Sequence, residues 1–273
     1  MTSSPAPIAE PEALDLLAHG QISVEGRMAG ASNATLYAAV SWQGVSAHCI
    51  YKPAAGERPL WDFPSGTLGK REVAAYEVST ATGWDVVPPT VWRDGPFGPG
   101  SVQLWVDAVD GEELIDVVEP NDVRPGWLTV LEAEGRRGEP LLLVHADDPR
   151  LARIAVFDTV IDNADRKVGH VLQTEDGHLW GVDHGVSFNV DDKLRTVLWG
   201  FAGSDLPAEA TDVLRALRSE LCSRSSVSLG AVLGGLLAAG EVRRTIDRVD
   251  RTLHSGAFPL PPVYGPAIPW PPW

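Results

Sequence analysis

The side chains best suited to chemistry lie in two short polar segments of the second half of the chain. The first segment supplies Asp165, then Lys167, and then a possible metal ligand, His170. The second places Asp183 after the apolar end of an expected strand. Phosphoryl transfer needs a carboxylate to orient the attacking hydroxyl, a cation to offset phosphoryl charge, and one or two metal ligands. The spacing therefore predicts a catalytic loop followed by a metal-binding loop.

Each aspartate also has an ordinary explanation. Asp162, Asp165 and Asp183 could each be a turn or cap residue, because aspartate is common at both positions. Any one of them alone is better explained in that way. Their joint occurrence in this order, after a segment of five expected strands, favours the catalytic interpretation.

The first half offers groups for the same reaction. Lys52 ends an apolar strand, and Glu72 lies on the helix expected next, over residues 67–83 with Thr67 as its cap. A Lys–Glu pair of this kind holds the ammonium against the α- and β-phosphates of a nucleotide. The loop of small residues containing Ser32 and Asn33 could cover phosphates with backbone N–H groups, although any hairpin turn can look similar.

The elements that must position these groups follow from hydrophobic periodicity and turn residues. Helices are expected over residues 149–161 and in most of 204–254, and a hairpin over 170–182. Residues 110–140 are acidic and are expected to be rich in loops. Five strands are expected at residues 22–28, 35–42, 45–51, 86–93 and 101–107.

Composition limits the classes of function. The chain has 273 residues, with 37 acidic and 22 basic side chains and a net charge of −15. This charge argues against a nucleic-acid partner and against strong binding to anionic lipid. Two cysteines cannot build a disulfide framework, and the first residues lack the features of a signal peptide, so a cytoplasmic location without a stable membrane anchor is expected.

Five motifs, in this order, resemble the phosphatidylinositol 3/4-kinase-related superfamily, and most closely its type II phosphatidylinositol 4-kinase branch with small bacterial, including actinobacterial, relatives. The motifs are YKP at 51–53, REVAAY at 71–76, GSVQLWV at 100–106, DNADRKVGH at 162–170 and VDHGVSF at 182–188. Together they cover roughly residues 22–190. The resemblance implies an α+β, two-lobed protein-kinase-like fold, with an antiparallel five-stranded N-lobe and a mainly helical C-lobe, and ATP with Mg²⁺ as cofactors.

The resemblance also implies roles for single residues. Lys52 would contact the ATP phosphates and Glu72 would pair with it, while Asp165 would be the catalytic carboxylate and Asp183 the principal metal ligand. The adenine would lie against a hinge made of Gln103, Leu104, Trp105 and Val106. The family usually has Asn where this chain has His170, and imidazole suits Mn²⁺ better than Mg²⁺.

The resulting expectation is an ATP-dependent phosphotransferase that acts on a hydroxyl of a protein or a soluble small molecule rather than a membrane lipid. The alternative is a weak or inactive pseudokinase-like module that binds nucleotide or protein. The expected parts are an N-terminal segment with a short helix (1–20), an N-lobe (21–107), a C-lobe (108–257) and a Pro/Trp-rich tail (258–273). The tail is either a polyproline-like strap on the surface or a docking peptide for a protein partner.

Overall fold

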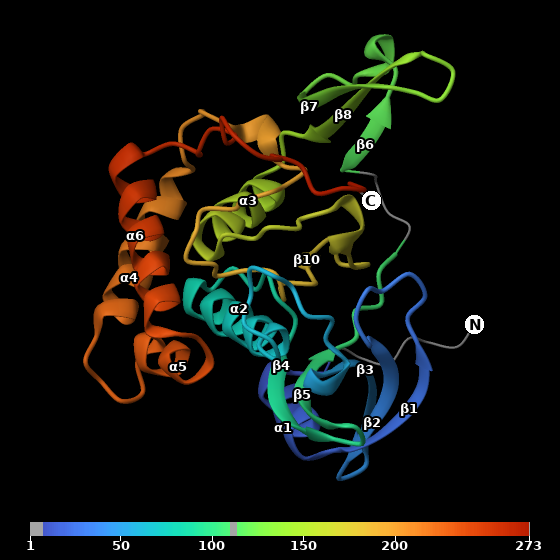
Figure 1. Ribbon diagram of the computed structural model, residues 1–273, viewed down its shortest axis with the longest axis vertical. Helices are drawn as coiled ribbons and strands as arrows, with labels where there is room; N and C mark the ends of the chain where they lie inside the picture. The colour runs from blue at the N-terminus through green and yellow to red at the C-terminus, as the bar shows by residue number, and fades with distance from the viewer. Residues whose placement is uncertain (1–7, 110–113, 273) are drawn as a thin grey trace.

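The five strands of the N-terminal half form one antiparallel sheet in the order β1-β2-β3-β5-β4 (Figure 1). The computed structural model describes residues 8–109 and 114–272. Gln43 and Gly44 both have positive φ, as the two-residue turn that joins a tight hairpin requires, and they connect β2 to β3 where the sequence predicts a turn. The strands are β1 (Gln21–Arg27), β2 (Leu36–Trp42), β3 (Val45–Pro53), β4 (Thr90–Gly95) and β5 (Gly98–Leu104).

The last two strands of this sheet differ from the expected bounds. The expected strands at 86–93 and 101–107 are shifted, because β4 starts after Pro88 and Pro89 and the turn between the strands is formed by residues 96–97. Proline has no N–H to donate to a strand ladder, which accounts for the later start. The turn-type residues Asp94-Gly95-Pro96 and Gly98-Pro99-Gly100, which lie between the two expected strands in the sequence, therefore lie largely within β4 and β5.

Two helices accompany this sheet. Helix α1 (Glu10–His19) buries Leu16 and Leu17 against β2 and β3. Helix α2 (Leu68–Thr82) begins at the expected place, but Thr67 makes no side-chain cap. The carboxylate of Glu57 instead accepts hydrogen bonds from the Leu68 and Gly69 amides, at 3.2 and 2.9 Å. A distant residue of the preceding loop thus replaces the local cap that the sequence suggests.

Within residues 115–146 a second antiparallel sheet forms, in the order β6-β8-β7, so the region at 110–140 that was expected to be rich in loops also contains two strands, β6 and β7; residues 110–113 lie outside the described residues. The strands are β6 (Ile115–Val118), β7 (Trp127–Glu134) and β8 (Pro140–Ala146). Figure 1 shows this sheet projecting from the top of the molecule, away from α4–α6. A register shift between Thr129 and Leu131 interrupts the alternation of β7, and its last residues are exposed acids, so the strand pattern is hard to recognise.

The rest of the chain is mainly helical, so the expected α+β fold class, with a five-stranded antiparallel N-terminal sheet and a helical C-terminal part, is confirmed. A large hydrophobic core joins residues of α2 to the C-terminal helices, and a smaller core lies under α1. Within the described residues no helix is long and apolar enough to cross a membrane. The remaining elements are α3 (Pro149–Ile161), the hairpin β9 (Val171–Gln173) and β10 (Leu179–Gly181), α4 (Ala208–Cys222), α5 (Leu229–Leu236) and α6 (Ala239–Ser255).

Candidate active site

A cleft of about 1120 Å³ lies between the five-stranded sheet and the loops around the β9–β10 hairpin. Apolar side chains from both sides, among them Ile50 and Leu172, line it together with the polar groups. Asp162 is not among the lining residues and pairs with Arg248 instead. The residues to which the sequence assigns a role in the site all line this cleft: Ser32, Asn33, Lys52, Glu72, Gln103, Leu104, Trp105, Val106, Asp165, Lys167, His170 and Asp183. Segments far apart in the sequence thus converge on one site.

Lys52 is the central cation of the cleft. Strand β3 carries it, and its Nζ lies 2.5 Å from Glu72 Oε1 on α2 and 2.9 Å from Asp183 Oδ1. Burial lowers the pKa of Lys52, but the carboxylates of Asp183 and Glu72 outweigh burial and raise it overall. Lys52 itself is the main cause that holds the pKa of Asp183 below its usual range. The ammonium therefore stays charged and joins the sheet to a loop of the C-terminal half.

Helix α2 is held to the C-terminal half, which orients Glu72. The buried guanidinium of Arg71 pairs with Glu241 on α6 and donates to the Ser187 carbonyl at 2.6 Å. The second carboxylate oxygen of Glu72 accepts from the His184 amide at 2.9 Å. Burial raises the pKa of Glu72, and Lys52 opposes this shift. Glu72 thus contacts both the lysine strand and the loop that carries Asp183.

Asp165 lies in the loop that follows α3. Its amide donates to Asn163 Oδ1 at 2.9 Å, and its carboxylate lies 3.2 Å from Lys167 Nζ. Burial raises the pKa of Asp165, while Lys167 and, more weakly, Arg195 act in the opposite direction. A carboxylate with a raised pKa and a cation beside it is the arrangement that a general base in phosphoryl transfer needs.

Arg166 is a site residue that sequence reasoning missed. Its fully buried guanidinium pairs with Asp158 and donates to the carbonyls of His170 and Val182, at 3.0 and 3.1 Å. It also lies 2.7 Å from His184 Nε2, which must be the acceptor because arginine only donates. One side chain therefore ties together the loops that carry Asp165 and Asp183. The only sequence signal is Asp158, an acid at the edge of the apolar stripe of its helix.

His170 and Asp183 are the residues that could hold a metal. His170 Nε2 lies 3.5 Å from Asp183 Oδ2, and Asp183 has the left-handed φ of 61° that aspartate tolerates. Burial lowers the pKa of His170 to about 4. Its buried Nδ1 has no hydrogen-bond partner among residues 8–109 and 114–272. In the same residues, no group of three or more His, Cys, Asp or Glu side chains could hold a metal by itself.

Two protein donors fit a metal that a nucleotide brings. Mg²⁺ in nucleotide sites usually takes one or two protein ligands and fills its other positions with phosphate oxygens and water. The carboxylate of Asp183 is half-exposed to the cleft, so it is available for such an ion.

The remaining predicted residues also line the cleft. The amides of Leu104 and Trp105 are bonded to Pro89 O and His48 O, so they are not available to an adenine edge. The side-chain amide of Gln103 is also in use, because it donates to the Thr90 hydroxyl. The side chain of Asn33 is used within the protein, where its Oδ1 accepts from the Arg58 amide at 2.8 Å.

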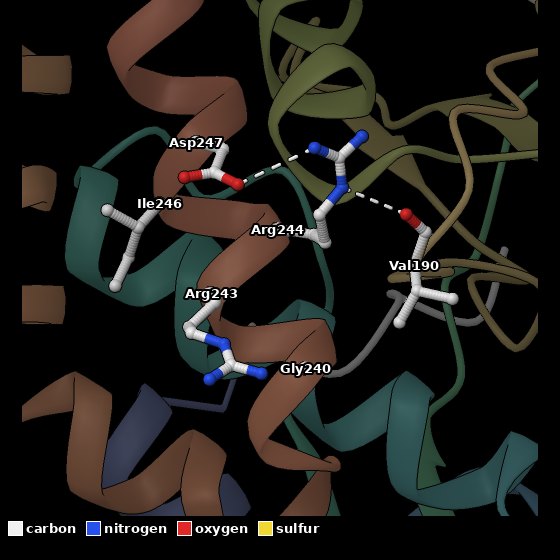
Figure 2. A pocket seen from close by; sticks show the side chains of 6 residues that line it. All are labelled: Val190, Gly240, Arg243, Arg244, Ile246 and Asp247. Atoms are coloured by element: carbon white, nitrogen blue, oxygen red, sulfur yellow. Dashed lines mark hydrogen bonds and ion pairs between the residues drawn. The ribbon is translucent and has the colours of Figure 1, made fainter.

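A second hollow, of about 370 Å³, lies beside α6 (Figure 2). Arg244 is already committed there, since it donates to Val190 O at 2.9 Å and lies 3.5 Å from Asp247. This hollow lacks the carboxylate and lysine cluster of the cleft. Its lining residues are Val190, Gly240, Arg243, Arg244, Ile246 and Asp247.

Comparisons with known proteins were made at the level of family, structure and sequence. No protein-family model matches the chain. Among solved structures it is similar to the proinflammatory kinase CtkA of Helicobacter pylori, with a TM-score of 0.47 and 10% identity, over 88% of this chain and 97% of that one. Among curated proteins it is 46% identical over 265 residues to Protein Rv2133c of Mycobacterium tuberculosis, covering 94% of both chains. The chain therefore belongs to the same family as Protein Rv2133c.

Proposed function

We propose that the chain is an ATP-dependent phosphotransferase of the phosphatidylinositol 3/4-kinase-like type. The observation that carries the proposal is the position of Lys52, whose Nζ contacts Glu72 and Asp183 at 2.5 and 2.9 Å in the same cleft as Asp165. A charged lysine held between a helix carboxylate and a metal-binding carboxylate is what a triphosphate site requires.

Each residue has a defined task in this proposal. Lys52 binds the α- and β-phosphates, and Glu72 keeps its ammonium in place. Asp165 orients the acceptor hydroxyl and takes its proton, while Lys167, 3.2 Å from that carboxylate, offsets charge on the transferred group. Asp183 and His170 would hold Mg²⁺ or Mn²⁺. When bound, this metal would offset negative charge on the phosphates.

The nucleotide base would lie deeper in the same cleft. Ile50 on β3 and Leu172 on β9 offer apolar surfaces from the two sides, and residues 103–106 form its edge. The backbone loop around Ser32 and Asn33 would cover the phosphates. Since the Leu104 and Trp105 amides are already bonded and the Val106 carbonyl accepts from the Ala108 amide, a polar contact to adenine would come from another group of this segment, such as the Val106 amide.

The acceptor is proposed to be a hydroxyl of a protein or of a soluble small molecule. A net charge of −15 disfavours close approach to anionic membrane lipids. The basic residues Arg58, Lys167 and Arg195 line the cleft beside its carboxylates, so cations are available there to a phosphate.

The test is transfer of label from γ-labelled ATP to components of a soluble lysate, with Mg²⁺ or Mn²⁺. Lys52→Met, Asp165→Asn and Asp183→Asn should each reduce transfer by about a hundredfold or more. Lys70→Met is the matched control, because Lys70 lies on α2 but contacts the Trp92 ring instead of the cleft. Equal transfer by the wild type and the three cleft variants would refute the proposal.

A pseudokinase-like binding module is the second candidate, and His170 favours it. Its imidazole stands 3.5 Å from Asp183, at the position where the resembled family has an amide oxygen. Thermal unfolding with ATP and each metal separates the candidates, since a ligand stabilises by about 2.7 kcal/mol at a hundred times its Kd. Stabilisation without label transfer would support the binding module.

A further inference from the structure

The C-terminal tail does not leave the molecule as a free peptide. After α6 it runs back over the C-terminal half, and Figure 1 shows its end close to the β9–β10 region. Tyr264 and Trp270 are 91% and 87% exposed. Pro269 and Pro272, in contrast, are buried. The tail thus packs against the protein through Pro269 and Pro272, while Tyr264 and Trp270 face outward.

Two backbone carbonyls anchor this part of the tail. The Ala267 carbonyl accepts from the Thr196 amide at 3.1 Å and from the Trp199 indole N–H at 2.7 Å. The Pro272 carbonyl accepts from the Val168 amide at 2.8 Å. Proline-rich chain has few donors but retains its carbonyls, so it can satisfy amides that loops leave without partners.

The amides of Val168 and Thr196, which bond to the tail, belong to the two segments that hold the loop of Asp165. Val168 directly follows Lys167 and begins the short turn that ends at His170. Thr196 follows Arg195, whose amide donates to Asn163 O and whose carbonyl accepts from the Arg166 amide, both at 3.0 Å. The residues on either side of Asp165 are therefore bonded to the 195–197 segment, and the tail bonds to that segment and to Val168.

We propose that residues 267–272 are a positioning element of the catalytic loop. They hold the Val168 amide and the 195–199 segment so that Lys167 and His170 face the cleft. The role in turnover rests on the proposed phosphotransferase function, whereas the effect on the loop backbone does not. The tail thus belongs to the architecture of the site, and the alternative of a docking peptide for a partner applies to its exposed aromatic side chains only.

The test compares the full chain with a chain that ends at Pro266, using hydrogen exchange of the peptide that contains residues 163–170. Exchange in this peptide should be about tenfold faster or more without the tail, because its Val168 amide loses its acceptor and the neighbouring segment loses its anchors. Tyr264→Ala is the control, since this exposed side chain lies in the tail before both anchors. It should leave the exchange unchanged.

Turnover gives the second measurement. The shortened chain should transfer phosphate about a hundredfold more slowly, as expected for a misplaced catalytic loop. Metal-free ATP binding should stay within about threefold, because the bonds that hold Lys52 and Glu72 go to each other, to Asp183 and to the His184 amide. Trp199→Phe, which removes the indole donor to Ala267 O while keeping an aromatic ring at this buried position, should show a smaller change in the same direction. It remains informative if the shortened chain does not fold.

The outcomes separate the two proposals. Unchanged exchange in both the shortened chain and Trp199→Phe would overturn the positioning role. Faster exchange with unchanged turnover would also overturn it. Faster exchange in a protein whose full chain shows no phosphate transfer would support the tail's hold on the loop and count against the phosphotransferase function alone.

Discussion

Arg166 and Asp158 form an ion pair in which Nε and Oδ2 are 2.8 Å apart and neither side chain is exposed to solvent. Arg166 also reaches the His170 and Val182 carbonyls, and Asn163 donates to Asp158 at 3.0 Å. The end of α3, the loop with Asp165 and the strand that leads to Asp183 thus share one buried network. The positions of Asp165 and Asp183 therefore depend on the Arg166–Asp158 pair, although neither Arg166 nor Asp158 is among the residues that line the cleft.

Arg166→Met should destabilise the protein by about 3–5 kcal/mol, because it leaves the Asp158 charge buried without its partner. Asp158→Asn should cost less, since Arg166 keeps its bonds to two carbonyls and to His184. Urea unfolding followed by circular dichroism measures both free energies. A cost below about 1 kcal/mol for Arg166→Met would mean that the network does not support the loops.

A second prediction compares two arginines of α6 that pair with the same acid, Asp192. The Arg248 side chain is 3% exposed and also bonds to Asp162 and to the Asn189 carbonyl, whereas that of Arg251 is 57% exposed. Arg248→Met should lower the free energy of unfolding by about 3 kcal/mol or more, because it leaves the buried carboxylate of Asp162 without its cation. Arg251→Met should cost less than about 1 kcal/mol. Similar values in urea unfolding would contradict this difference.

The sequence predicts the local parts of the fold well. The α3 helix, the hairpin that follows it and the two aspartates are recognisable because each depends on residues close together in the chain. The cap of α2 is not recognisable in the sequence, because Glu57 accepts from the first amides of the helix across a loop and takes the place of Thr67. The bonds of Arg166 and Val168 likewise depend on partners that only the folded chain brings near, and no periodicity encodes them.

The three-stranded sheet was missed for a different reason. Its strands have mixed burial and acidic ends, so their alternation is weak, and one strand contains a register shift. Strand patterns are clear only when one face is buried along its full length. The five-stranded sheet satisfies this condition in β2 and β3, where Ala38, Val40, Cys49 and Tyr51 are fully buried, and there the prediction agrees with the structure.

The third prediction concerns pH. Burial raises the pKa of Asp165 above its ordinary value of 3.8, and Lys167 counteracts this shift. If Asp165 acts as a carboxylate, kcat/KM should fall as the pH drops, with a midpoint above 3.8. Lys167→Met removes the opposing charge, so the midpoint should move to higher pH. The measurement is the pH profile of ATP turnover over the range in which circular dichroism shows folded protein. A midpoint that moves to lower pH, or does not move, would show that another group titrates.

The fourth prediction concerns the choice of metal. His170 Nε2 lies 3.5 Å from Asp183, so an ion bound by Asp183 would have imidazole as its second protein donor. Imidazole suits Mn²⁺ better than Mg²⁺, and an amide oxygen suits Mg²⁺. His170→Asn should therefore shift the ratio of activity in Mg²⁺ to that in Mn²⁺ towards Mg²⁺ by about tenfold, which corresponds to about 1.4 kcal/mol.

The same ratio can be measured as nucleotide-dependent thermal stabilisation, so the prediction holds for an enzyme and for a binding module alike. His254→Asn is the matched control, because His254 is exposed at the end of α6 and does not line the cleft. An unchanged ratio in His170→Asn would place the metal on Asp183 without the imidazole. In that case His170 would serve the site through its carbonyl, which accepts from Arg166 and from the Val182 amide, both at 3.0 Å.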